Sequence, residues 1–106
     1  MHMKSDQELN YLAATGLLHW TAKDGFFINS MKGKRYAISD YSPLTDQTQY
    51  QEIASKMQAR DYELTVRKVD SGVEVQFSKY GENFSHIDST EMRAGTIAAL
   101  LAYKQL

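Results

Sequence analysis

The sequence contains no cysteine, only one proline, and no apolar run near the ~20 residues that a bilayer-spanning helix needs. Without cysteine, disulfides and thiolate metal sites are excluded, and this fits a reducing cytosol. Without a long apolar segment or a secretory pattern, we expect neither membrane insertion nor secretion. The absence of linkers, low-complexity tracts and repeats predicts a single domain.

The first residues need separate treatment. The start Met1-His2-Met3 is typical of a cloning scar ahead of a native methionine. A histidine left by a tag can bind metal without functional meaning, so His2 enters no site argument. We therefore predict one domain over residues 3–106.

Neither sign of charge is in excess. The chain has 12 Lys and Arg against 13 Asp and Glu, a net charge of −1 at pH 7. Proteins that neutralise several phosphates usually carry a basic surplus, so this balance disfavours nucleic acid as the partner. A composition of 42% hydrophobic and 24% charged residues is ordinary for a globular domain. A chain of 106 residues can fold without disulfide or metal support.

The first predicted helix starts at Ser5. Ser5 and Glu8 have the spacing of a capping box, in which each side chain accepts a hydrogen bond from a free amide at the helix start. Leu9, Leu12 and Ala13 recur at helical spacing, and Gly16 is expected to end the helix.

Two more helices are predicted from apolar stripes. The second begins either at Ser42, with Pro43 as its first residue, or at Thr45 or Asp46. The third is expected to begin near Asp88, with Glu91 completing a capping box. The stripes themselves are Tyr50, Ile53, Ala54 and Met57 in the second helix, and Ala94, Ile97, Ala98 and Leu101 in the third.

The remaining apolar segments are typical of strands. Turn signals at 23–25 and 31–33 predict a small aromatic hairpin between the first two helices. The alternating runs 62–69 and 73–77, joined by Asp70-Ser71-Gly72, give the strongest hairpin signal in the chain. A third strand is expected over 84–87. The predicted class is α+β with the order α-ββ-α-βββ-α, and Trp20, Phe26, Tyr36, Phe77 and Phe84 are candidates for the core.

This order and four stretches of sequence resemble the phage alpha-beta-alpha sandwich domain, a family of small phage and prophage proteins. The stretches are the opening helix running into His19-Trp20, the segment Asp40-Tyr41-Ser42-Pro43-Leu44-Thr45-Asp46, the hairpin Tyr62 to Phe77, and Ala98-Ala99-Leu100-Leu101-Ala102-Tyr103-Lys104. Pro43 and Leu44, placed between the Ser and the Thr, depart from the usual pattern. The resemblance implies a central antiparallel sheet with helices packed on it, and a phage or prophage origin. It brings no catalytic residue.

The histidines do not have the spacing of a metal site. His19 adjoins Trp20 in an apolar segment, and His86 ends a predicted strand. Neither belongs to an HxH or HxxxH pattern. His86, Asp88 and Ser89 are close in sequence, but the last two are better explained as helix caps, and no G-x-S-x-G turn exposes a nucleophile. We predict no catalytic, cofactor-binding or metal-ligating residue, and no enzymatic activity.

Five residues are candidates for partner contacts. Lys32, Lys34 and Arg35 surround Gly33 at a hairpin tip, where they could hold a phosphate or an acidic partner or simply face solvent. Tyr41 and Tyr80 lie in predicted turns, where we expect them to be exposed and able to anchor a partner.

The sequence therefore predicts a non-enzymatic phage or prophage accessory protein of the host cytoplasm that binds a host or phage protein. Inhibition of a host defence system such as CRISPR is one form of this hypothesis. The alternative is a protein that binds or sequesters a small ligand such as a nucleotide signal, with Lys34 and Arg35 as its basic groups. The chain could be a monomer or a homodimer, and no cofactor is expected.

Overall fold

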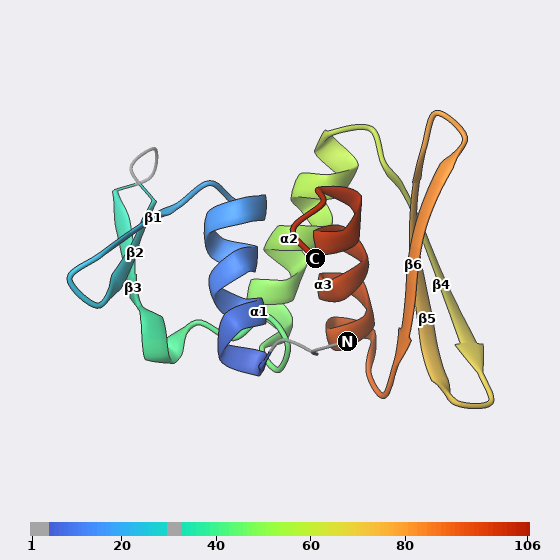
Figure 1. Ribbon diagram of the computed structural model, residues 1–106, viewed down its shortest axis with the longest axis horizontal. Coiled ribbons are helices and arrows are strands. Elements are labelled where there is room, and N and C mark those ends of the chain that lie inside the picture. The colour runs from blue at the N-terminus through green and yellow to red at the C-terminus, as the bar shows by residue number, and fades with distance from the viewer. Residues whose placement is uncertain (1–4, 30–32) are drawn as a thin grey trace.

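The computed structural model describes residues 5–29 and 33–106 (Figure 1). Its elements, in chain order, are α1 (Asp6–Leu12), η1 (Ala13–Leu17), β1 (Thr21–Lys23), β2 (Phe26–Asn29), β3 (Lys34–Ala37), η2 (Ile38–Asp40), α2 (Gln47–Ala59), β4 (Glu63–Val69), β5 (Gly72–Lys79), β6 (Glu82–Asp88) and α3 (Glu91–Ala102). The predicted α+β class and element order are confirmed. The predicted turn residues Met31 and Lys32 lie outside the described residues.

The strands form two antiparallel sheets, β1-β2-β3 and β4-β5-β6, instead of one central sheet. The helices lie between these sheets in Figure 1. The short strand β1, which the sequence did not predict, pairs with β2 through Thr21 and Ile28. Only the larger sheet packs on α3, whereas the smaller sheet contacts η1 through β1.

The first helix starts as predicted but ends later. Ser5 caps α1, and both halves of the capping box with Glu8 are present. The prediction that Gly16 ends the helix is wrong, because the chain continues through a π-helical turn, η1, to Leu17. His19 ends it with a left-handed backbone, φ 58°. Gly16 instead leaves room for the Gln105 side chain.

The starts of the other two helices follow from side-chain caps. Asp46 caps α2 by accepting a hydrogen bond from the Gln49 amide at 3.0 Å, which selects one of the three predicted starts. Thr90, not Asp88, caps α3, through the Arg93 amide at 3.2 Å. The prediction for α3 is wrong because the Asp88 carboxylate instead bonds the Ser89 amide and the side chains of His86 and Arg93.

The larger sheet follows the predicted alternation. Val75 and Phe77 of β5 are fully buried, while Gln76 between them faces the other side. Phe77 lies opposite Leu64 of β4 and Phe84 of β6. This sheet therefore has one face against α3 and one polar face, as expected for an antiparallel sheet covered on one side.

Aromatic side chains form the core beneath the smaller sheet. Trp20 stacks on Tyr36 with ring centroids 5.1 Å apart, and Tyr41 meets Trp20 and Phe27 edge to face at 5.2 and 5.5 Å. Phe27 is fully buried, whereas the neighbouring Phe26 is only half-buried. Alternation along β2 explains this difference, since successive side chains point to opposite faces.

Helix α3 is buried around most of its circumference. It packs on β5 and β6 on one side and on α2 and η1 on the other. Its buried residues are Ala94, Gly95, Thr96, Ile97, Ala98, Ala99, Leu100 and Ala102. Small residues dominate this set, so neighbouring elements approach the helix backbone closely. Within the described residues, no helix has the length and apolarity that crossing a membrane would take.

Gly95 and Tyr50 make the closest of these approaches. Tyr50 of α2 is fully buried, and a Cβ at Gly95 would overlap its hydroxyl and lie 2.5 Å from Cε1. The hydroxyl has no hydrogen-bond partner within the described residues. Burial, with a contribution from the Glu91 charge, raises the pKa of Tyr50 above its ordinary value. The contact between α2 and α3 thus requires glycine at this position.

Gly95→Ala should destabilise the fold, although alanine is the better helix former by up to about 1 kcal/mol. The added methyl group overpacks a site whose neighbour cannot move, and we expect a net loss of about 1–3 kcal/mol in the free energy of unfolding. Urea denaturation measures this loss. Gly16→Ala is the matched control, because the atoms nearest its Cβ belong to the end of the flexible Gln105 side chain. A Gly95→Ala variant as stable as the parent would contradict the packing described.

Candidate functional site

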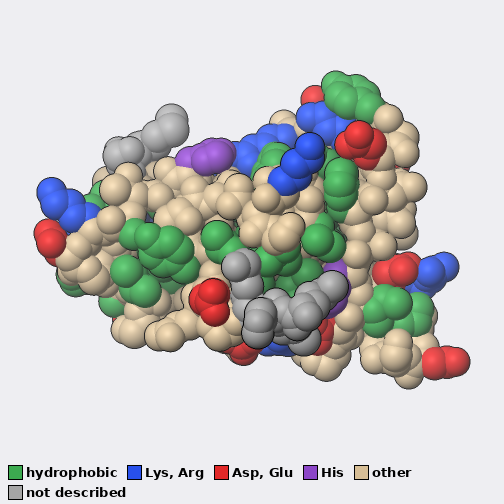
Figure 2. All heavy atoms as spheres, in the orientation of Figure 1, with side chains coloured by type: hydrophobic (Ala, Val, Ile, Leu, Met, Phe, Trp, Pro, Cys, Tyr) green, Lys and Arg blue, Asp and Glu red, His purple; other side chains and the backbone are tan. Residues whose placement is uncertain are grey.

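An open groove of about 810 Å³ lies between α2 and the start of the smaller sheet. Its walls carry both charged and neutral polar groups over an apolar floor. The lining residues are Leu18, His19, Trp20, Asn29, Thr48, Gln51, Glu52, Ser55, Lys56, Ala59 and Arg60. Along the upper edge of the molecule, Figure 2 shows a histidine close to basic side chains.

One wall of the groove depends on the end of η1. The left-handed backbone of His19 turns the chain sharply from η1 into β1, and the Trp20 amide bonds the Ala14 carbonyl at 2.9 Å. As a result Trp20 is buried against Tyr36, whereas His19 is exposed at the rim. Leu18 and Trp20, both largely buried, form the apolar floor.

The opposite wall is the outward face of α2. Glu52, Lys56 and Arg60 follow one another at intervals of four residues and therefore lie on one side of the helix. The Arg60 guanidinium stacks over the Tyr103 ring at 5.1 Å. Its Nη1 atom is buried and has no hydrogen-bond partner within ranges 5–29 and 33–106. The wall thus offers two cations, one carboxylate and several neutral polar groups.

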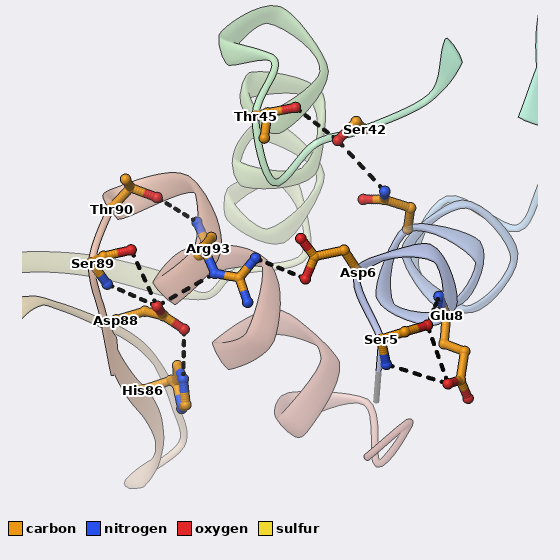
Figure 3. A network of polar contacts seen from close by, with 11 residues as sticks. Ser5, Asp6, Glu8, Ser42, Thr45, His86, Asp88, Ser89, Thr90 and Arg93 are labelled. Atoms are coloured by element: carbon orange, nitrogen blue, oxygen red, sulfur yellow. Dashed lines mark hydrogen bonds and ion pairs between the residues drawn. The ribbon is translucent and has the colours of Figure 1, made fainter. Parts of the chain in front are cut away.

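A second polar cluster ties α1, β6 and α3 together (Figure 3). Arg93 donates from Nη1 to Asp6 Oδ1 at 2.9 Å and from Nε to Asp88 Oδ1 at 3.4 Å. Asp88 Oδ2 pairs with His86 Nε2 at 3.2 Å, and the Ser89 amide donates to Oδ1 at 2.8 Å. Arg93 therefore lies between two carboxylates that come from opposite ends of the chain.

The cluster has the residue types of a catalytic triad without its geometry. The Ser89 hydroxyl donates to Asp88 at 3.4 Å and makes no hydrogen bond to His86. A nucleophilic serine would need the histidine as its base and the carboxylate behind that histidine. Across the described ranges, no group of three His, Cys, Asp or Glu side chains is placed to hold a metal ion. The geometry of this cluster is that of a structural clamp.

Asp88 is held in its ionised form by this clamp. Burial alone would raise its pKa, but the Ser89 amide, the His86 ring and the Arg93 charge outweigh burial, and the pKa lies below its usual range. The carboxylate therefore stabilises the folded chain only while it is charged.

The four described residues among the five predicted to contact a partner do not lie together on one surface. Lys34 and Arg35 are exposed on β3, where Arg35 lies 4.8 Å over the Phe26 ring. Tyr80 is 89% exposed in the turn between β5 and β6, in the other sheet. Lys32 lies outside the described residues. Partner contact by these residues stays a prediction.

The expectation that Tyr41 is exposed is wrong. Only 2% of its surface is accessible, and burial, with the charges of Glu52 and Tyr36, raises its pKa above the ordinary value. The local turn sequence gave no sign of this burial, because the rings that cover Tyr41 come from Trp20, Tyr36 and Phe27.

Sequence reasoning missed the groove. A partial signal existed in Gln51 and Lys56, which fall outside the apolar stripe of α2. The contribution of His19 could not be foreseen, because it depends on a left-handed backbone at a residue other than glycine.

Tyr80 lines a second, smaller hollow of about 250 Å³ with Asp61, Glu63 and Lys79.

Fold and site together define an α+β protein with two three-stranded sheets around a helical layer and an open polar groove. No family model matches the chain, and no curated protein sequence does. The chain is similar in structure to a phage protein from Bacillus cereus ATCC 14579, known from a 2.0 Å crystal structure. The match has a TM-score of 0.76, covers 100% of this chain and 93% of the other, and has 19% sequence identity. The two proteins share a fold.

The Asp88 clamp predicts a pH dependence of stability. Because the pKa of Asp88 is lower in the folded chain than in the unfolded one, its contribution is complete above pH ~4, the ordinary carboxyl pKa, and declines as the pH falls through the folded value. Asp88→Asn should remove this part of the dependence and cost about 1.5–3 kcal/mol at pH 7. Thermal unfolding between pH 2 and 7 measures both effects. Asp24→Asn, at an exposed turn, is the control, and identical pH profiles for all three proteins would contradict the clamp.

Proposed function

We propose that this chain is a small phage accessory protein of the host cytoplasm that works by binding a protein, without catalysing a reaction. One finding supports the phage assignment, namely the fold shared with the Bacillus cereus phage protein. A host defence component such as a CRISPR effector is one candidate partner. Fold alone does not determine function, so the proposal depends on the groove.

The observation that carries the proposal is the composition of the groove. Its floor is apolar at Leu18 and Trp20, and its rim carries neutral and charged polar groups from α2. An apolar centre with a polar rim is the usual anatomy of a protein–protein interface. Gln51 and Ser55 are exposed on the wall and free to adapt their hydrogen bonds. The groove therefore suits a protruding segment of a partner.

The test uses two glutamines of the same helix. Gln51 lines the groove, whereas Gln58 is exposed on α2 outside it. A partner captured from lysate by the tagged parent should be retained by Gln58→Arg. Its affinity for Gln51→Arg should be weaker by about 10-fold or more, which corresponds to at least about 1.4 kcal/mol. Titration by calorimetry or interferometry with the purified partner measures the difference.

Two results would count against this proposal. One is equal affinity of both variants for the partner, which would place the contact elsewhere. The other is the absence of any stoichiometric partner for a chain shown to be folded by its cooperative thermal transition.

A small anionic ligand is the second candidate, and the two cations on the groove wall favour it. Arg60 and Lys56 lie one helical turn apart on the same wall, where they could hold a phosphate between them. In this second proposal the basic groups are Lys56 and Arg60 at the C-terminal end of α2, whereas the sequence points to Lys34 and Arg35.

Thermal-shift screening against a panel of nucleotides tests this second candidate. A ligand present at 100 times its dissociation constant should add about 2.7 kcal/mol of stability. Lys56→Gln should abolish the shift, and Lys34→Gln, an exposed lysine on β3, should leave it intact. Loss of the shift in Lys34→Gln alone would place the ligand on β3. No shift with any nucleotide would remove this candidate.

A further inference from the structure

Strand β4 is an edge strand of the larger sheet, and its outer side is unpaired within the described residues. It is seven residues long and pairs with β5 on one side only, and no backbone hydrogen bond to its other side occurs within the described residues. Helix α3 packs on β5 and β6, so it leaves β4 less covered. Val66, on the helix side of β4, is 44% exposed. A long edge with an exposed apolar side chain is a template for pairing with another strand.

We propose that the occupant of this edge is a second copy of the same chain, paired antiparallel along β4 with the twofold axis at Thr65. The two sheets then join into one sheet of six strands, with the helices of both copies on the same side. The argument rests on the self-complementarity of the strand in this register.

In this register the facing pairs within residues 62–68 are complementary. Glu63 lies opposite Arg67 of the second copy, and Leu64 lies opposite Val66 of the second copy. Tyr62, just before the strand, faces Lys68 of the second copy. Each pair occurs twice because the axis is twofold. Opposite charges and apolar pairs directly across neighbouring strands are the contacts that stabilise antiparallel sheets.

The pairs also continue rows that already exist within each copy. Arg67 Nη2 bonds Glu74 Oε1 of β5 at 2.6 Å, and its side chain is still 66% exposed. Glu63 of the second copy would add a second carboxylate on the open side of the guanidinium. On the helix side, Val75 lies beside Val66, and Phe77 lies beside Leu64. Joining two copies makes one continuous apolar row from these residues.

Other pairings are less complementary. Centring the axis on Val66 would place Glu63 opposite Val69 and Leu64 opposite Lys68, which satisfies neither charge. The other edge of the sheet, β6, disfavours self-pairing, because an axis at Ser85 would bring Glu82 opposite Asp88. Like charges directly opposite destabilise a sheet. The strands of the smaller sheet have only three or four residues.

The first test measures mass against concentration by analytical ultracentrifugation. The parent should approach twice the 12.1 kDa chain mass as its concentration rises. Glu63→Arg should weaken the dimer about 10-fold or more, because it places two arginines face to face twice. Adding Arg67→Glu together with Glu74→Arg exchanges the charges while keeping an opposite-charge pair between β4 and β5, and should restore the dimer. Glu82→Arg, on the opposite edge strand, should leave the dimer unchanged.

The second test fixes the register by crosslinking. The chain has no cysteine, so Thr65→Cys introduces a single thiol on the twofold axis. Residues directly opposite in an antiparallel pair have Cα atoms about 4.5–5.5 Å apart, within disulfide range. Mild oxidation should therefore crosslink Thr65→Cys. In Val69→Cys the two thiols would lie eight residues apart along the strands, about 27 Å at about 3.4 Å per residue, and should not crosslink.

A parent that stays monomeric at ~1 mM, with Thr65→Cys uncrosslinked, would overturn the proposal. So would a dimer insensitive to Glu63→Arg, since its interface would then lie elsewhere. Crosslinking of Val69→Cys in preference to Thr65→Cys would refute the register. Glu63 is exposed and makes no side-chain hydrogen bond within the described residues, so its substitution does not threaten the fold. A thermal melt of each variant verifies this.

Discussion

The fold depends on the burial of α3 from nearly every direction. A helix with one apolar stripe needs one partner, but a helix that is apolar all round must be enclosed. The larger sheet covers one side of α3, and α2 and η1 cover the rest. Close enclosure is possible because most of the buried residues of α3 are alanine or glycine, and Gly95 lets α2 approach until Tyr50 touches the helix backbone.

This enclosure determines where the surface remains open. The apolar stripe of α2 packs against α3, so its polar face points outward. The chain leaves η1 and enters the smaller sheet beside this polar face. The groove forms at this junction. On the other side, α3 is centred over β5 and β6, and the edge strand β4 is left with an unpaired side. Both proposed interaction surfaces are thus consequences of the placement of one helix.

Features encoded by near neighbours could be predicted from the sequence, and features that need distant contacts could not. Alternation predicted the hairpin of β4 and β5, and the capping box predicted the start of α1. The three helices are each followed by a left-handed residue other than glycine, namely His19, Asp61 or Lys104, so a rule based on glycine could not locate their ends. The local sequence pattern predicts Asp88 as a helix cap because it does not show that Asp88 bonds Arg93. Arg93 in turn bonds Asp6 at the other end of the chain.

Native-state hydrogen exchange of the α3 amides tests the central claim most directly. If α3 is enclosed as described, the amides from Ile97 to Leu100 should exchange only through global unfolding, with protection equal to the full free energy of unfolding measured in urea. The strands β1 to β3 should exchange earlier through local opening. Exchange of the α3 amides before those of β5 would show that the helix can detach from an intact sheet, and this would contradict the account.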